Sequence, residues 1–121
     1  MKMSKKTILV AEDKDYLADI IFEYLGNEFE CLRASSVDEV YQKINDVDAA
    51  LVSLNVRKAD SIKPDVFVRK IKEIKDVPML ILTSMLSSSI RILLLEAGAD
   101  DVMTKPFNPD EMKLRMLKLV K

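Results

Sequence analysis

The sequence predicts an α/β fold, a doubly wound sheet of five parallel strands with helices on both faces, in the order (βα)5. Short apolar runs of strand length alternate with longer amphipathic stretches along all 121 residues. Polar residues that can do chemistry directly follow several of these runs, as happens where parallel strands end at one edge of a sheet. A chain of this length is sufficient for one buried core, so we expect a single domain over residues 1–121.

The first half of the chain contains three apolar runs separated by two helical stretches. We expect strands at residues 7–11, 29–33 and 49–53, and helices at about 15–26 and from 37. The first helix stops at Gly26, where we expect a residue that tolerates a left-handed backbone. Ser36 and Glu39 have the spacing of a capping box, in which each side chain binds a free backbone amide of the second helix. The third run is apolar almost throughout, which favours a central strand covered on both faces.

The second half continues the alternation after a polar loop. We expect helices at residues 64–74, 87–97 and from 109 to the chain end, and strands at 78–82 and 101–104. Gly98 ends the fourth helix, because glycine reaches the left-handed region without strain. Asn108 and Glu111 are expected to cap the last helix, whose apolar residues, Leu114 among them, should face the core.

Composition excludes several classes of function. The formal net charge of -1 gives no reason to expect a nucleic-acid or anionic-membrane surface. No apolar stretch approaches the roughly 20 residues that span a bilayer, and the first run is too short for a signal peptide, so we expect a cytoplasmic protein. The absence of histidine excludes His-based triads, His metal ligands and a phosphohistidine, and leaves carboxylates, lysine, serine and threonine for the chemistry.

The candidate site consists of the polar residues at the carboxyl ends of the strands. They are far apart in the sequence, but a doubly wound fold brings such positions to one edge of the sheet. These residues are Glu12, Asp13, Ser53, Thr83 and Lys105.

Three segments identify a resemblance that covers nearly the whole chain. They are Glu12-Asp13, the run Pro78–Ser84 and the run Glu96–Phe107, which ends in Lys105-Pro106-Phe107. With these segments in a five-strand α/β pattern, the chain resembles a bacterial two-component response-regulator receiver domain, which has a flavodoxin-like fold. The resemblance implies a regulatory module in phosphorelay signal transduction and transcription regulation, rather than an enzyme.

The resemblance also implies roles for individual residues. In the family, the acidic pair binds Mg²⁺, an aspartate after the third strand accepts a phosphoryl group, and a hydroxyl and a lysine sense the phosphate. Glu12, Asp13 and the backbone carbonyl of Asn55 match the metal ligands. Thr83 and Lys105 match the phosphate-sensing pair, and the Lys105-Pro106 peptide resembles one that is often cis in the family.

Four positions depart from the family pattern. Ser53 stands where the phospho-acceptor aspartate is expected, Arg57 where the family usually has proline, and Ser61 where glycine often stands. Val102 occupies the switch position, at which an aromatic residue usually changes rotamer on activation.

Ser53 changes the chemistry that the resemblance implies. A serine hydroxyl needs an adjacent base to become a good nucleophile, and fewer carboxylates hold Mg²⁺ more weakly. We therefore expect a pseudo-receiver that is inactive at Ser53, with no cofactor or a weakly held Mg²⁺, and with Lys105 paired to Glu12 or Asp13. Ser53 is either natural or an engineered replacement of an aspartate, and Asp60 is the nearest spare acid that could accept a phosphoryl group instead.

The expected output surface comprises the fourth helix, the fifth strand and the fifth helix. Its candidate residues are Arg91, Leu95, Asp100, Asp101, Glu111 and Arg115. The resemblance implies a protein partner, either a histidine kinase or a downstream regulator, and homodimerisation through this surface; a solvated charged face is the alternative. Nucleic acid would be bound only through a further domain, if the chain is the receiver fragment of a DNA-binding transcription regulator.

Overall fold

The computed structural model describes residues 5–56 and 59–120, with the side chain of residue 60 not described. Within these residues, five parallel strands form one sheet in the order β2-β1-β3-β4-β5. The strands are β1 (Lys6–Ala11), β2 (Phe29–Ala34), β3 (Ala49–Ser53), β4 (Met79–Thr83) and β5 (Asp101–Thr104). The order reverses between β1 and β3, which is where doubly wound folds place their sites.

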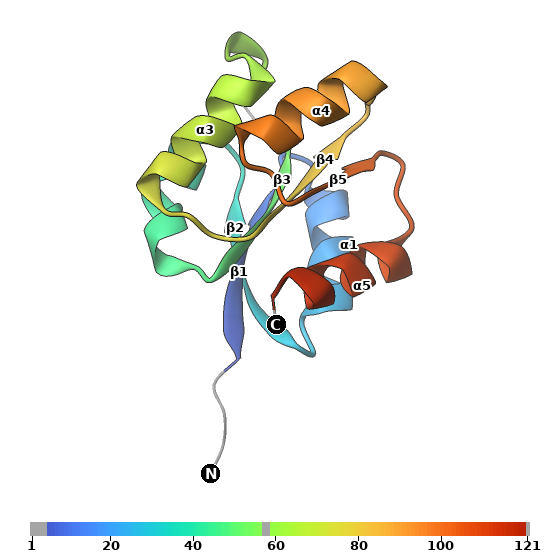
Figure 1. Cartoon of the computed structure of the whole chain (residues 1–121). Coiled ribbons are helices and arrows are strands. Elements are labelled where there is room, and N and C mark those ends of the chain that lie inside the picture. Colours follow the sequence, from blue (N-terminus) through green and yellow to red (C-terminus); the bar gives the residue numbers. More distant parts are fainter. Residues whose placement is uncertain (1–4, 57–58, 121) are drawn as a thin grey trace.

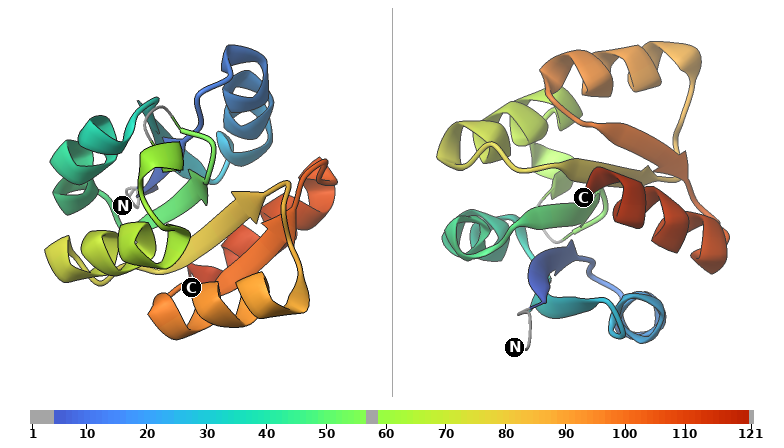
Figure 2. Two further views of the ribbon diagram at one scale, coloured as in Figure 1. Left: turned by 90° about the horizontal axis from the view of Figure 1, so that it is seen from above. Right: turned by 60° about the horizontal axis from the view of Figure 1, so that its bottom comes forward.

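The helices cover both faces of the sheet. They are α1 (Asp15–Leu25), α2 (Val37–Lys43), α3 (Pro64–Ile74), α4 (Ser88–Ala97) and α5 (Pro109–Leu119), with short 3-10 turns η1 (Ile44–Asp46) and η2 (Ala59–Ser61). α2, α3 and α4 lie on one face, and α1 and α5 lie on the other (Figures 1 and 2). The predicted fold class is confirmed.

Two apolar layers hold these helices to the sheet. Alternate residues of the strands point to opposite faces, so β1 sends Leu9 into the layer under α2, α3 and α4, and Val10 into the layer under α1 and α5. β3 and β4 are buried at every position, as predicted for central strands. The site at the strand ends therefore rests on a rigid, close-packed support.

The strand register aligns the carboxyl ends of the sheet. Ala11 of β1 pairs with Val52 of β3, and Ser53 of β3 pairs with Leu82 of β4. Thr83 pairs with Thr104 at the ends of β4 and β5. The residues that directly follow or close these strands consequently meet at one edge, as the sequence predicts.

Of the two helix ends predicted at glycines with a left-handed backbone, one is confirmed and one is wrong. Gly98 ends α4 with a positive φ of 124°, as expected. Gly26 ends α1 with a right-handed backbone instead, φ -65°. The helix runs on into a right-handed turn, in which the Glu28 amide donates to the Leu25 carbonyl at 3.1 Å, so no left-handed residue is needed there.

The two predicted capping boxes are only half formed. The Ser36 hydroxyl accepts from the Glu39 amide at 3.3 Å, but the Glu39 carboxylate turns to the amide and hydroxyl of Ser35. Asn108 caps α5 by accepting from the Asp110 and Glu111 amides. The Glu111 carboxylate binds an arginine one turn further along α5 instead of completing the box.

One residue of α5 contradicts its predicted burial. Leu114 is 61% exposed, while Met112 and Met116 on the same helix are fully buried. Leu114 lies two positions from each, which places it roughly 200° away around the helix axis. Among residues 5–56 and 59–120, no helix combines the length and apolar character that a membrane-spanning segment needs.

Candidate functional site

Lys105 lies at the centre of the site. It directly follows β5, and its amide donates to the Thr83 carbonyl at 2.9 Å, which ties it to the end of β4. Its Nζ donates to Glu12 Oε1 at 2.7 Å and to Asn55 Oδ1 at 3.0 Å. The peptide between Lys105 and Pro106 is cis, as the resemblance implies. The lysine thus joins the ends of β1, β3 and β5.

Ser53 is fully buried at the end of β3 and lies close to the ion pair of Lys105 with Glu12. Its hydroxyl donates to the side-chain oxygen of Asn55, the same oxygen that accepts from Lys105. An amide oxygen accepts a hydrogen bond but is not basic enough to take the proton, so this contact does not activate the serine as a nucleophile. The Asn55 side chain thus occupies the acceptor role toward Lys105 that a carboxylate at position 53 would have.

Glu12 and Asp13 have different environments although they are adjacent. Glu12 is fully buried, and its second oxygen, Oε2, accepts from the Lys14 amide at 3.0 Å. The side chain of Asp13 is exposed and has no hydrogen bond or ion pair with the described residues. Lys105 therefore pairs with Glu12, one of the two partners that the sequence left open.

The donor set at this edge does not fit the Mg²⁺ site of the family. Both Glu12 oxygens are already engaged, and Ser53 supplies a neutral hydroxyl in place of a carboxylate. Within the described part of the chain, no group of three or more acidic, cysteine or histidine residues is placed to hold a metal. Mg²⁺ prefers anionic oxygens, and Asp13 is the one carboxylate of this site that is free to supply them.

Arg33 of β2 holds the loop that carries the acidic pair. Its guanidinium donates to the Glu12 carbonyl at 2.9 and 3.1 Å and to the Asp13 carbonyl at 3.1 Å. The same group pairs with Asp15 at 2.9 Å at the start of α1. A planar fork of donors suits such multiple contacts. The loop is therefore fixed by a side-chain cation.

Thr83 is buried at the end of β4, and its Oγ1 accepts from the Met85 amide at 3.2 Å. Thr83 also lines a pocket of about 990 Å³ that opens between the β3–α3 and β4–α4 connections. Ser53, Asn55 and Lys105 line the same pocket. The structure thus brings together four of the predicted site residues around one cavity, with Glu12 buried behind Lys105.

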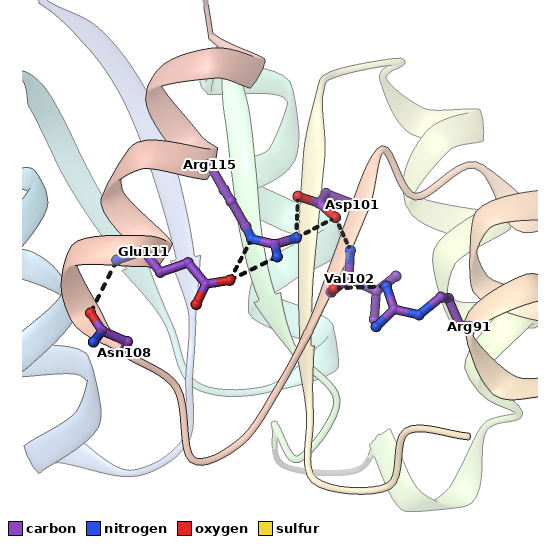
Figure 3. Close-up of polar contacts among 6 residues, drawn as sticks. All are labelled: Arg91, Asp101, Val102, Asn108, Glu111 and Arg115. Atoms are coloured by element: carbon purple, nitrogen blue, oxygen red, sulfur yellow. Dashed lines mark hydrogen bonds and ion pairs between the residues drawn. The ribbon is translucent and has the colours of Figure 1, made fainter. Parts of the chain in front are cut away.

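Val102, which the resemblance places at the switch position, is buried in the layer beneath α4. Its carbonyl accepts from Arg91 of α4 at 3.3 Å, and its amide donates to Asp101 at 2.9 Å (Figure 3). A valine has no polar tip and a short side chain, so it lacks the means to swing between the core and the surface as an aromatic residue can.

An ion-pair network connects β5 to α5 on the predicted output surface. Arg115 contacts both oxygens of Asp101 at 2.9 and 2.8 Å and Glu111 Oε2 at 2.7 and 3.1 Å (Figure 3). These hydrogen bonds, first those to Asp101, raise the pKa of Arg115 above its ordinary value. Arg91 approaches the same strand but pairs with no carboxylate among the described residues.

Two other predicted interface residues, Leu95 and Asp100, take no part in the Arg115 network. Leu95 is 41% exposed on α4. Asp100 lies outside the Arg115 network, because its carboxylate accepts from Lys72 at 3.1 Å and from the Met79 amide at 2.8 Å. That carboxylate therefore joins α3 to the start of β4.

Sequence reasoning missed two side chains of the site, Arg33 and Asn55. Asn55 was expected to act through its backbone carbonyl, yet its side-chain oxygen binds Ser53 and Lys105. A neutral acceptor two residues after Ser53 was the available signal. Arg33 is the next-to-last residue of β2, which adjoins β1, and a cation so near that strand end was the signal there. The spare acid Asp60 and the departure at Arg57 lie outside the described side chains.

Comparison with known proteins identifies the family and agrees with the fold. Residues 8–117 match the response regulator receiver domain family. The chain is 31% identical over 115 residues to the transcriptional regulatory protein VxrB of Vibrio cholerae, an alignment that covers 93% of this chain and 45% of VxrB. It is 32% identical over 117 residues to the transcriptional regulatory protein SrrA of Staphylococcus aureus, covering 94% of this chain and 47% of SrrA.

A solved structure gives the same result for the fold. A putative response regulator from Chloroflexus aurantiacus superimposes with a TM-score of 0.82 and 28% identity, covering 97% of this chain and 98% of that one. The present chain spans about half the length of the two curated relatives that it matches.

Proposed function

Because this chain belongs to the response regulator receiver domain family, we propose that it is a pseudo-receiver that regulates a partner independently of phosphorylation, at Ser53 or at another residue. Receiver domains of response regulators are regulatory modules that interact with histidine kinases and downstream regulators. The observation that carries the proposal is the bonding of Ser53 and Lys105. The serine donates to an amide oxygen, and the lysine is already neutralised by Glu12 at 2.7 Å.

The groups around Ser53 support this proposal chemically. An aspartate is ionised at neutral pH and attacks phosphorus without help, whereas a serine needs a base within hydrogen-bond reach. The Ser53 hydroxyl contacts Asn55, which cannot take its proton, and the buried carboxylate of Glu12 is engaged by Lys105 and by the Lys14 amide. The site therefore offers no general base to the serine among the described residues.

The contacts of Arg33 and Lys105 support a site that is stable without bound Mg²⁺. In this proposal Mg²⁺ is absent or weakly held, because Asp13 alone supplies a free carboxylate. Arg33 fixes the β1–α1 loop and Lys105 neutralises Glu12, so both tasks of a bound cation are performed by side chains. Thr83 and Lys105, the phosphate-sensing pair of the family, would then keep a structural role.

The experiment that tests the proposal is phosphotransfer from acetyl phosphate with Mg²⁺, followed by intact-mass spectrometry. We expect no added phosphoryl group on the chain as given or on Ser53→Ala, and one phosphoryl group on Ser53→Asp. A phosphoryl group on the given chain that hydroxylamine removes would show a carboxylate acceptor, such as Asp60, and would overturn the proposal. A hydroxylamine-stable phosphoryl group that Ser53→Ala abolishes would overturn it equally, since Ser53 would be the acceptor.

For the output, we propose homodimerisation through α4, β5 and α5. Arg115 holds Asp101 and Glu111 in fixed positions across β5 and α5, and Arg91 is left without a carboxylate of its own in the described chain. Exposed apolar side chains of α4, Leu95 among them, adjoin these charges. An apolar centre with a charged rim is the usual anatomy of a protein interface.

Sedimentation velocity at increasing concentration tests this surface. We expect the chain to dimerise, and Leu95→Glu to remain monomeric because it would bury an unpaired charge. Met85→Glu is the matched control, since Met85 is 79% exposed on the β4–α4 connection, outside the surface. A monomeric parent chain at all concentrations, or equal behaviour of the two variants, would refute the assignment.

The names of two relatives support a role in transcription regulation. VxrB and SrrA are named transcriptional regulatory proteins and are about twice the length that this chain covers. We propose that the chain acts in the cytoplasm in transcription regulation, and that DNA contact is made by a domain outside this sequence. If Ser53 is an engineered replacement, the Ser53→Asp variant represents the original receiver, and its phosphorylation describes the natural switch.

A further inference from the structure

The pocket beside Ser53 has the size of a small-molecule site. Its volume is about 990 Å³, at the upper end of the roughly 300–1,000 Å³ range of ligand pockets. It lies between the β3–α3 and β4–α4 connections, and one side is lined by aliphatic residues from both. These apolar residues include Leu54, Val56, Ile62, Leu86 and Ile90.

The other end of the pocket carries hydrogen-bond donors. Lys105 has three N–H groups, of which Glu12 and Asn55 accept two. The Thr83 oxygen accepts from the Met85 amide, which leaves its O–H free to donate into the pocket. The Asn55 oxygen is occupied by Ser53 and Lys105, and its NH₂ group donates to none of the described residues. Lys105, Thr83 and Asn55, which the hydrogen bonds of Lys105 tie together, therefore each offer a donor in the lining of a largely apolar pocket.

The charge of the lining selects the ligand. Lys105 is the one charged residue among the described residues that line the pocket, while Glu12 lies buried behind it and Asp13 does not line it. With serine at position 53, the carboxylate that an aspartate would place beside Lys105 and Thr83 is missing. A carboxylate supplied from outside would meet the same donors.

From these observations we infer that the pocket binds a small organic carboxylate with an apolar body. The carboxylate would accept from Lys105, Thr83 and Asn55, and the body would lie against Leu86, Ile90 and the other aliphatic residues of the wall. Glu12 already neutralises Lys105, so the donors contribute moderately and we expect dissociation constants of roughly 0.1–10 mM for a ligand of six carbons. This inference does not depend on whether Ser53 accepts a phosphoryl group.

The test uses three probes in titrations followed by ¹H–¹⁵N correlation spectra of the labelled chain. Hexanoate has both the head group and the body, 1-hexanol has the body alone, and acetate has the head group alone. We expect hexanoate to shift the amides of Asn55, Thr83, Leu86 and Ile90 saturably. Both partial probes should bind at least about fivefold more weakly, since each lacks one half of the recognition.

Matched variants assign the two halves of the site. Thr83→Val is nearly isosteric. It should weaken the binding of hexanoate about fivefold, because it removes a hydrogen bond to a charged group, and should leave the binding of hexanol unchanged. Leu86→Gln should weaken the binding of both hexanoate and hexanol. If Leu86→Gln does not fold, as judged by loss of a dispersed spectrum, Ile62→Gln is used in its place. Leu114→Gln alters an exposed leucine on α5, outside the pocket, and should bind like the parent chain.

The outcomes separate cleanly. Saturable shifts at the pocket that follow this order of probes and variants support the site. The proposed site is overturned if the shifts are confined to other surfaces. It is also overturned if no shifts appear up to about 50 mM hexanoate, which is five times the largest dissociation constant expected here. Equal binding of hexanoate and hexanol also overturns it, because the carboxylate would then have no role.

Discussion

The ion pair between Lys105 and Glu12 gives the most quantitative prediction. Glu12 is fully buried, the Lys105 side chain is 12% exposed, and their charged atoms are 2.7 Å apart. Lys105→Met keeps the apolar stem and removes the ammonium group, which leaves the Glu12 carboxylate without its charge partner. Removing one member of a buried pair costs about 3–5 kcal/mol in unfolding free energy. That is a large share of the ~5–15 kcal/mol that stabilises a typical domain.

Urea unfolding followed by circular dichroism measures this cost. Lys118→Met is the control, because Lys118 is exposed on α5 and the chemical change is the same; we expect it to change stability by less than about 0.5 kcal/mol. The double variant Glu12→Gln/Lys105→Met should be more stable than the sum of its single variants predicts, by at least about 1 kcal/mol. A loss for Lys105→Met as small as that of the control, or strict additivity, would refute the view that this pair takes the place of a metal ion.

Three further predictions concern other parts of the chain. Burial raises the pKa of Cys31 to about 11 from an ordinary 9.0, so at pH 8 iodoacetamide should modify the folded chain roughly 100-fold more slowly than the urea-unfolded chain, and equal rates would contradict this. Hydrogen bonds from Ser35, first from its hydroxyl and then from its amide, lower the pKa of Glu39 to about 2 from 4.5. A lowered folded pKa stabilises above the unfolded value, so Glu39→Gln should reduce the melting temperature at pH 7, and the difference should vanish as the pH falls from 4.5 toward 2. Gly98→Ala should cost about 1–2 kcal/mol in urea unfolding, because φ is 124° and the new Cβ would lie 3.0 Å from Lys72 Cγ; an unchanged midpoint would disprove the strain.

The fold could be predicted from the sequence because its signals are local. The third strand, predicted at residues 49–53, and the fifth, predicted at 101–104, are found with the same bounds. Apolar periodicity marks such elements over a few residues, and Gly98 marks a helix end through its own backbone freedom. A local pattern predicts less well where several backbone conformations fit it. Gly26 is an example, because a right-handed turn closes α1 there.

The composition of the site could be predicted because parallel strands end at one edge. Glu12, Ser53, Thr83 and Lys105 each follow or close a strand, and the register aligns these ends. Which side chain contacts which could not be predicted. The sequence left Lys105 open to either acid of the pair. It placed a neutral acceptor, Asn55, two residues after Ser53, but that spacing does not determine that one side-chain oxygen accepts from both Ser53 and Lys105.

The sequence by itself determined the class of fold, the edge of the sheet at which the polar residues gather and the presence of a serine, Ser53, at the end of the third strand. Each of these follows from residue type and short-range spacing. The tertiary structure alone decided that Lys105 pairs with Glu12, 93 residues away, that Arg33 holds the acidic loop and that an apolar pocket opens beside the site. Those outcomes depend on loop paths and rotamers that distant segments select jointly when they pack, and no local pattern encodes them.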